Sequence, residues 1–227
     1  NPRTAGRALP SGRVTAAQML GGIVVAVLLF ECVCLGFLLA FDNPWPLMLS
    51  LPVLAWIMAY PWTKRFTALC HVYLGSSLAI SPLAAAIAIE PATLGSQPGL
   101  WLLAGTVLLW VAGFDIIYAL QDIDIDQRDG LHSLPGRLGP ARALLLSRVM
   151  HAAAAICLVT LTLVDPRLGL VFGTAVAMTI ALLIYEHATV ARWGTTKIAL
   201  AFFTLNGIIS CLLGGAGIVD LARSALN

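Results

Sequence analysis

Residues 99–121 read GLWLLAGTVLLWVAGFDIIYALQ, and Asp115 is the one charged residue among them. A helix of about 20 apolar residues spans the hydrocarbon core of a bilayer. Inside lipid, each backbone N–H and C=O group must find its partner within the segment, which favours a helix over a strand. The stretch therefore predicts a transmembrane helix that carries a carboxyl group inside the membrane.

Six more apolar stretches flank this one, at 14–41, 44–60, 68–89, 141–164, 168–185 and 198–219. The 227 residues are 59% hydrophobic and 11% charged, whereas soluble domains carry about 25% charged residues. Seven such helices in a soluble protein would leave no polar surface to face water. We expect an all-α, multi-pass transmembrane bundle of about seven helices, forming a single domain over residues 1–227.

Basic residues are distributed unevenly between the connections. If the helices alternate in direction, one set of connections and adjoining turns carries eleven basic residues: Arg3, Arg7, Arg13, Lys64, Arg65, Arg128, Arg137, Arg142, Arg148, Arg192 and Lys197. The other set carries Arg167 and Arg223 alone. Because cytoplasmic loops are enriched in Lys and Arg, the first set is expected to face the cytoplasm.

Four polar side chains follow one another at helical spacing toward the cytoplasmic end of the 99–121 stretch. At 100° per residue, Asp115, Tyr118, Asp122 and Asp126 share an arc of roughly 80°, while Asp124 points to the opposite side. Asp115 lies about two turns inside the membrane, where an ionisable group usually marks a functional interior. The polar loop expected at 122–140 continues from this face.

Carboxylates at positions i and i+4 project side by side and suit Mg²⁺, which typically links a few carboxylates to a phosphate. A helix end with solvated acids, or acids paired with arginine, would give the same spacing. Basic side chains expected on the same membrane face are the usual partners of phosphate oxygens: Arg3, Arg7, Lys64, Arg65 and Arg137. Topology alone would also place them there. Together, acids and bases indicate a metal–diphosphate site above an apolar chamber, with a lipid diphosphate as its ligand.

Other polar residues give weaker signals. His132 and Ser133 are candidates for capping or ligand contact, while His71, His151 and His187 are expected to be helix-end or packing residues. Asn206 lies in an apolar run and is expected to form a hydrogen bond between helices. The sequence contains no nucleotide-binding glycine loop, no Gly-x-Ser-x-Gly and no zinc-like cluster. No nucleic-acid partner is expected.

The segment 115–126, followed by 130–135, resembles the second aspartate motif of the UbiA superfamily of intramembrane aromatic prenyltransferases. The likeness is strong to bacterial 4-hydroxybenzoate polyprenyltransferases and their relatives in menaquinone synthesis. Residues 60–67 and 71–75 resemble the same family's cytoplasmic Lys-Arg motif and the helix after it, and 202–207 resemble its last helix. Residues 3–9 resemble a family Arg-Thr-x-x-Arg-Pro-Leu run, with Ala8 in place of the proline.

The resemblance implies a polyprenyl transfer from polyprenyl diphosphate to an aromatic acid such as 4-hydroxybenzoate, in ubiquinone or menaquinone synthesis. Asp122 and Asp126 would hold Mg²⁺, and the Arg and Lys residues would bind the diphosphate. Asp115 or Tyr118 would position the allylic cation or receive the ring proton. The enzyme would lie in the bacterial inner membrane with its active site facing the cytoplasm.

The same resemblance implies a fold of nine helices, with a first aspartate motif ahead of Arg3. Neither that motif nor the two helices before it occur in these residues, so we expect this chain to lack half of the metal site and to be inactive alone. Two other functions are weighed against this one. A CDP-alcohol phosphatidyltransferase would need an Asp-Gly-x-x-Ala-Arg run, which is missing, and a cation-coupled transporter would need charges near the midplane of several helices.

Overall fold

A computed structural model describes residues 4–226, and for residues 200–202 it describes the backbone alone. The described chain contains seven helices that are long and apolar enough to cross a membrane. They are α1 (Ala16–Phe41), α2 (Trp45–Thr63), α3 (Cys70–Ile89), α5 (Pro98–Ala119), α8 (Pro140–Val164), α9 (Leu170–Trp193) and α10 (Asn206–Leu226). The protein is therefore a multi-pass helical membrane bundle, as its sequence predicts.

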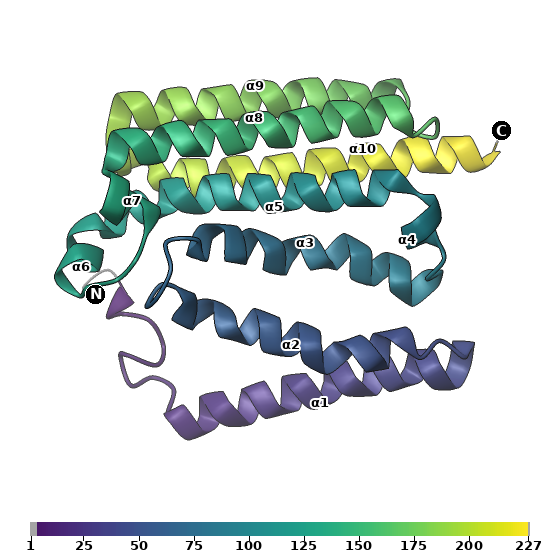
Figure 1. Cartoon of the computed structure of the whole chain (residues 1–227), viewed down its shortest axis with the longest axis horizontal. Coiled ribbons are helices and arrows are strands. Elements are labelled where there is room, and N and C mark those ends of the chain that lie inside the picture. The colour runs from purple at the N-terminus through teal and green to yellow at the C-terminus, as the bar shows by residue number, and fades with distance from the viewer. Residues whose placement is uncertain (1–3, 227) are drawn as a thin grey trace.

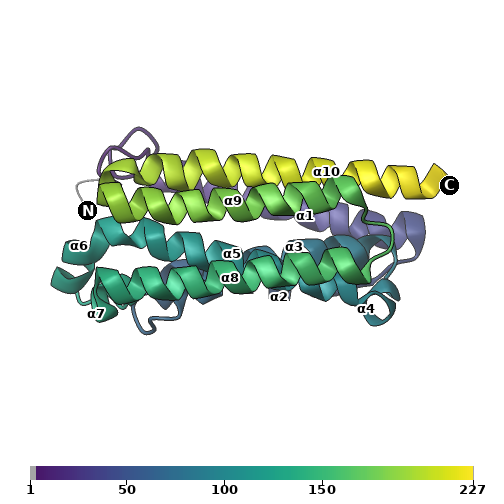
Figure 2. The ribbon, with the colours of Figure 1, turned by 90° about the horizontal axis from the view of Figure 1, so that it is seen from above.

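The long helices run back and forth, and each packs on the one that follows it (Figures 1 and 2). The N-terminal segment, the α2–α3 turn and the α9–α10 connection lie at one end, and the α1–α2 turn and the C-terminus lie at the other (Figure 1). The connections thus alternate as expected, and the basic set shares one end of the bundle. Of the short helices, α4 (Thr93–Ser96) lies at the opposite end (Figure 1).

Local sequence signals set several helix boundaries. Thr15 begins α1 with a capping box, in which its side chain accepts from the Gln18 N–H and the Gln18 side chain bonds back; this satisfies donors that the first turn leaves free. Pro98 and Pro140 occupy first-turn positions, where a missing N–H costs nothing. Gly194, at φ 56°, ends α9. The polar residues after 185 stay helical up to that glycine, so α9 is longer than its hydropathy predicted.

The region expected as a polar loop, 122–140, is instead largely helical. The 3-10 helix η2 (Leu120–Asp122) leads into α6 (Ile123–Arg128), and α7 (Leu134–Leu138) follows. Ser133 begins α7, since its hydroxyl accepts from the Gly136 N–H at 3.2 Å. Before α10, residues Leu200–Leu205 form a π-helix, so α10 begins later than the predicted residue 198.

Helix α5 lies at the centre of the bundle, between α3 and α8. Glycines permit this close packing. A Cβ at Gly75 of α3 would overlap the Leu108 carbonyl oxygen of α5, and one at Gly113 of α5 would overlap the ring of His151 on α8. The Ser147 hydroxyl also donates to the Gly113 carbonyl at 2.7 Å. Small residues of this kind bring helix backbones together in membranes, and here they fix the helix that carries Asp115.

Candidate functional site: a polar cavity at the basic end of the bundle

A polar cavity of about 310 Å³ opens where the N-terminal segment, α2, α3 and α5 meet. Its lining comprises Thr4, Arg7, Tyr60, Pro61, Lys64, Cys70, His71, Asp115, Tyr118, Ala119 and Asp122. Five of the predicted site residues are therefore brought together here: Arg7, Lys64, Asp115, Tyr118 and Asp122. Two bases and two acids facing one cavity form a site for a ligand that carries both an anion and a cation.

The acids do not follow one continuous α-helix. The 3-10 helix at Leu120–Asp122 turns about 120° per residue, so the face that carries Asp115 and Tyr118 shifts before α6 begins. Asp122 still lines the cavity, but Asp126 is not part of its lining. Asp115, Tyr118 and Asp122 therefore face one cavity, as their helical spacing predicted, whereas Asp126 does not. The spacing of 100° per residue applies only to an unbroken α-helix.

Asp126 lies next to the cavity, behind Lys64. Its side chain is buried, and the Lys64 ammonium contacts Asp126 Oδ1 at 2.8 Å. Its second oxygen, Oδ2, is buried and has no hydrogen-bond partner among the residues that the structure describes. A buried carboxylate oxygen without a donor is costly, so this atom is suited to a further cation or donor.

His71 connects Asp115 to the start of α7. Its Nδ1 lies 2.7 Å from Asp115 Oδ2, and its Nε2 accepts the Leu134 N–H at 3.3 Å. The imidazole is 2% exposed. The His71 ring of α3 thus forms hydrogen bonds to Asp115 of α5 and to Leu134 of α7, so the three helices meet at this ring.

Two further bonds hold the α2–α3 turn against the segment after α6. The His132 N–H donates to the Lys64 carbonyl at 2.7 Å, and the Cys70 thiol donates to the His132 carbonyl at 3.6 Å. With the Lys64–Asp126 pair, these contacts link two segments that are more than sixty residues apart in the chain. We call this group of contacts the basic-end clip, comprising Lys64, Cys70, His71, Asp126, His132 and Leu134.

The remaining predicted phosphate ligands lie elsewhere. Arg65 and Arg137 are exposed at the same end of the bundle but do not line the cavity. Arg3 lies outside the described residues. Asp124 is exposed, in line with its expected position away from the acidic face. The cavity therefore has Arg7 and Lys64 as the basic side chains in its described lining.

Several functional candidates escaped the sequence reasoning. His71 was expected to be a packing residue, and Tyr60 and Cys70 were not singled out, yet all three line the cavity. Helical spacing could have pointed to His71, because it lies one turn before Gly75 on α3 and therefore shares the face that packs on α5. The expectation for Asn206 is confirmed, because its Oδ1 accepts the Trp110 indole N–H at 2.8 Å, which joins α5 to α10.

Two further acids, which the sequence analysis did not single out, lie within other membrane-spanning helices. Glu31 lies within α1 and accepts the Ser50 hydroxyl of α2 at 2.9 Å. Glu186 lies within α9, fully buried, and neither of its carboxyl oxygens has a hydrogen-bond partner among the described residues. Averaging hydropathy over a long window hides single acids of this kind.

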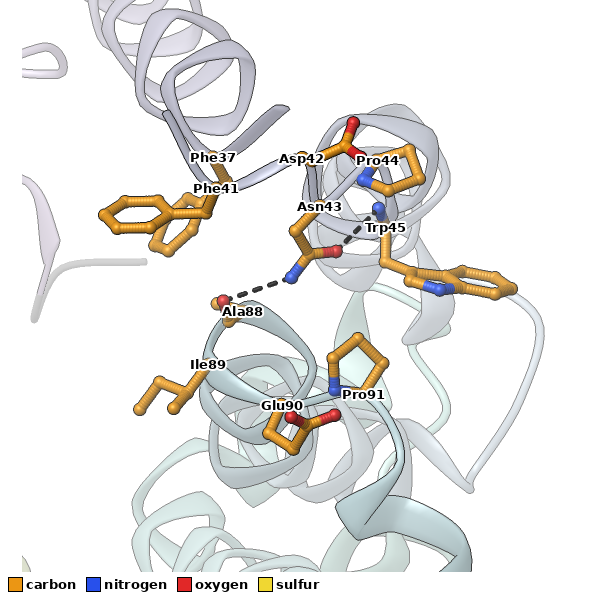
Figure 3. A pocket seen from close by; sticks show the side chains of 10 residues that line it. All are labelled: Phe37, Phe41, Asp42, Asn43, Pro44, Trp45, Ala88, Ile89, Glu90 and Pro91. Carbon is orange, nitrogen blue, oxygen red and sulfur yellow. Dashed lines mark hydrogen bonds between the residues drawn. The ribbon is translucent and has the colours of Figure 1, made fainter. Parts of the chain in front are cut away.

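Two larger cavities differ in chemistry from the polar one. One, of about 460 Å³, lies at the opposite end between the α1–α2 turn and the end of α3 (Figure 3). Asn43 donates there to the Ala88 carbonyl at 3.1 Å and accepts the Trp45 N–H at 3.1 Å (Figure 3). No basic side chain lines it, so it is unsuited to a diphosphate.

The other cavity, of about 470 Å³, is walled mainly by apolar side chains of α5, α8, α9 and α10. Trp110 lines it, and Phe114 and Tyr118 follow Trp110 on α5 at intervals of four residues. Residues at this spacing share one helix face. The face of α5 that borders the polar cavity at Tyr118 thus continues into an apolar interior.

Comparison with known proteins identifies relatives over most of the chain. The sequence model described as the UbiA prenyltransferase family matches residues 1–208. The 4-hydroxybenzoate octaprenyltransferases of Salmonella paratyphi B and Salmonella enteritidis are each 32% identical over 208 residues, covering 90% of this chain and 67% of the relative. The apo structure of a UbiA homolog from Aeropyrum pernix K1 is 33% identical, with a TM-score of 0.84 over 97% of this chain and 78% of that one.

Proposed function

Because the chain belongs to the UbiA prenyltransferase family, we propose that it serves the transfer of a polyprenyl group from its diphosphate to an aromatic acid such as 4-hydroxybenzoate. Ubiquinone or menaquinone synthesis is the corresponding pathway. Family membership also favours this function over a lipid phosphatidyltransferase or an ion-coupled transporter. The reaction would take place in the bacterial inner membrane, at its cytoplasmic face.

The observation that carries the proposal is the polar cavity at the basic end, whose lining includes Tyr118 on the same face of α5 as Trp110 of the apolar cavity. A polyprenyl diphosphate is an amphiphile with an anionic head and a long hydrocarbon chain. Arg7 and Lys64 would bind the head, with Arg3, Arg65 and Arg137 as further basic candidates around the opening. The face of α5 from Tyr118 to Trp110 would guide the chain inward.

The carboxylates suit a divalent cation. Asp122 lines the cavity, and Asp126 Oδ2 is a buried oxygen without a hydrogen-bond partner in the described part of the chain. Oxygen ligands of this type match Mg²⁺, which would stabilise the negative charge that develops on the leaving diphosphate. Among the described residues, no group of three or more acidic, His or Cys side chains is arranged to hold a metal ion. The diphosphate and further oxygen donors would supply the other ligands of the ion.

The side chains of this chain would contribute in three ways. Arg7 and Lys64 stabilise charge on the diphosphate oxygens as the allylic C–O bond breaks. The apolar walls keep water from the allylic cation until the aromatic ring attacks it. Asp115 or Tyr118 then receives the proton that the ring loses, because both face the cavity.

The test uses membranes that contain the full gene product, supplied with labelled polyprenyl diphosphate, Mg²⁺ and 4-hydroxybenzoate. We expect a labelled aromatic product that requires Mg²⁺ and is lost in Asp122→Asn. Asp124→Asn is the matched control, since Asp124 is an exposed acid two residues away, and it should retain activity.

The outcomes separate the parts of the proposal. If the diphosphate is bound or consumed without product, 4-hydroxybenzoate is the wrong acceptor and other aromatic acids should be tried. If both aspartate variants behave like the wild type, Asp122 has no role in the metal site. Folded protein that neither binds nor consumes the diphosphate would overturn the proposed function.

A further inference from the structure

The hydrogen bonds of His71 determine which of its nitrogens carries a proton. A backbone N–H can only donate, so the Leu134 N–H at 3.3 Å requires a lone pair on Nε2. The ring proton of a neutral imidazole is then on Nδ1, which lies 2.7 Å from Asp115 Oδ2. His71 is therefore a neutral donor, and Asp115 accepts its hydrogen bond as a carboxylate. The backbone of α7 thus selects the tautomer that a carboxylate requires.

This arrangement keeps an ionised carboxylate at the wall of the cavity. Asp115 lines the cavity and is half-buried, and its Oδ2 lies 2.7 Å from the His71 ring. The hydrogen bond from Nδ1 stabilises the carboxylate and fixes its orientation. The ionisable groups that share the lining with it are Arg7, Tyr60, Lys64, Cys70, Tyr118 and Asp122.

We propose that His71 is a positioning residue that holds Asp115 as the acceptor of the proton released by the aromatic ring. This inference rests on the proposed function. The allylic C–O bond breaks and its electron pair leaves with the diphosphate, while a ring carbon forms the new C–C bond. The electron pair of the C–H bond at that carbon then restores the aromatic ring, and the proton passes to a carboxylate oxygen of Asp115.

His71 acts through Asp115, because both of its ring nitrogens are already bonded. The ring is also buried to 2% exposure between α3 and α5, so it can orient the carboxylate while remaining fixed itself. A glutamine at this position offers an N–H₂ donor for Asp115 and a carbonyl acceptor for Leu134. An alanine offers neither.

The kinetic test compares His71→Gln with His71→Ala in membranes containing the full gene product. We expect His71→Ala to lower kcat by about tenfold, a part of the roughly 10²–10⁴-fold that a general base contributes, with little change in the KM for the diphosphate. His71→Gln should recover most of the lost kcat. A loss shared equally by the two variants, or one confined to KM, would overturn the positioning role.

A double-mutant cycle separates this role from simple loss of structure. If His71 acts through Asp115, then His71→Ala should have no further effect on the residual kcat of Asp115→Asn. A purely structural defect would lower kcat by the same factor in both backgrounds. Additive losses would therefore contradict the inference even if each single variant is slow.

The tautomer can be tested without any turnover. In ¹⁵N-histidine-labelled protein, we expect the His71 resonances of a neutral ring with the proton on Nδ1. Leu134→Pro removes the backbone donor at the first position of α7, where proline is tolerated, and should release this preference; Leu134→Ala loses the same packing but keeps the N–H. A proton found on Nε2 in the wild type overturns the inference whether or not prenyl transfer occurs. If the expected tautomer is found but no prenyl transfer occurs, only the proposed function is contradicted.

Discussion

Gly75 controls how closely helix α3 approaches α5, and Gly75→Ala is expected to damage both stability and the site. The added Cβ would overlap the Leu108 carbonyl oxygen and lie 3.1 Å from the Leu108 carbonyl carbon and 3.3 Å from Ala112 N. These are backbone atoms and cannot rotate away. Since carbon contacts are optimal at about 3.5–4.0 Å, the helices must separate by roughly 0.5–1 Å for the carbon alone.

That displacement acts directly on the site, because His71 lies one turn before Gly75 on the same face. The 2.7 Å bond from His71 Nδ1 to Asp115 Oδ2 would lengthen to roughly 3.2–3.7 Å, at or beyond the limit for a hydrogen bond. Overpacking of this kind costs about 1–3 kcal/mol. For a chain of this size, that corresponds to a fall in Tm of roughly 2–12 °C.

The assay is thermal unfolding in detergent, combined with the kcat of prenyl transfer in membranes. Gly105→Ala is the matched control on α5, since its Cβ would meet Cys157 Sγ at an ordinary 3.8 Å. We expect the control to keep its Tm and activity, and Gly75→Ala to lose both. A Gly75→Ala protein as stable and active as the control would refute the argument that the two backbones are in contact here.

Three other features of the structure give simple tests. Trp110→Phe removes the indole donor to Asn206 Oδ1 and should cost about 1 kcal/mol of stability, measured as a lower Tm. Gly194→Ala places a Cβ on a residue at φ 56° and should cost about 1–2 kcal/mol, also measured by Tm. Hydrogen bonds from Arg167 lower the pKa of Asp165, so this pair stabilises the protein at neutral pH and its contribution is lost as the pH falls through the folded-state pKa. Asp165→Asn should therefore flatten the acidic part of the curve of Tm against pH.

Each of these tests has an outcome that contradicts its premise. Trp110→Phe should leave the Tm unchanged if water replaces the indole as the donor to Asn206. An unchanged Gly194→Ala protein would mean that α9 can end without a positive φ. If the wild type and Asp165→Asn lose stability in parallel on acidification, then the carboxyl that titrates lies elsewhere in the chain.

The membrane-spanning helices were predictable because hydropathy is a local property. Seven apolar stretches predicted seven spans, and the structure has them. Helix ends were less predictable: α9 runs on to Trp193 because the backbone at Gly194, and not the loss of hydropathy at 185, ends it. Residues 122–140 were expected to be a loop because they are polar. Short helices such as α7, which begins at the Ser133 cap, form there without an apolar face of their own.

The site was predictable only as far as its parts lie on one helix. Asp115, Tyr118 and Asp122 share the cavity as their spacing indicated. A single 3-10 turn was enough to move Asp126 out of its lining, and no residue in the sequence marks that turn. His71 could not be recognised as the partner of Asp115, because their contact depends on how closely α3 approaches α5. Gly75 permits that approach, but a glycine in the sequence does not show which helix packs against it.

The basic-end clip also sets an order of events during synthesis. The Lys64 carbonyl and the His71 ring find their partners at His132 and Leu134, more than sixty residues later in the chain. At roughly 5–20 residues per second, the ribosome needs on the order of 3–14 s to make that intervening length. During this interval α2 and α3 are in the membrane with the turn between them unengaged. The clip can therefore form only once α5, α6 and the start of α7 have been made, while α8, α9 and α10 are still to be synthesised.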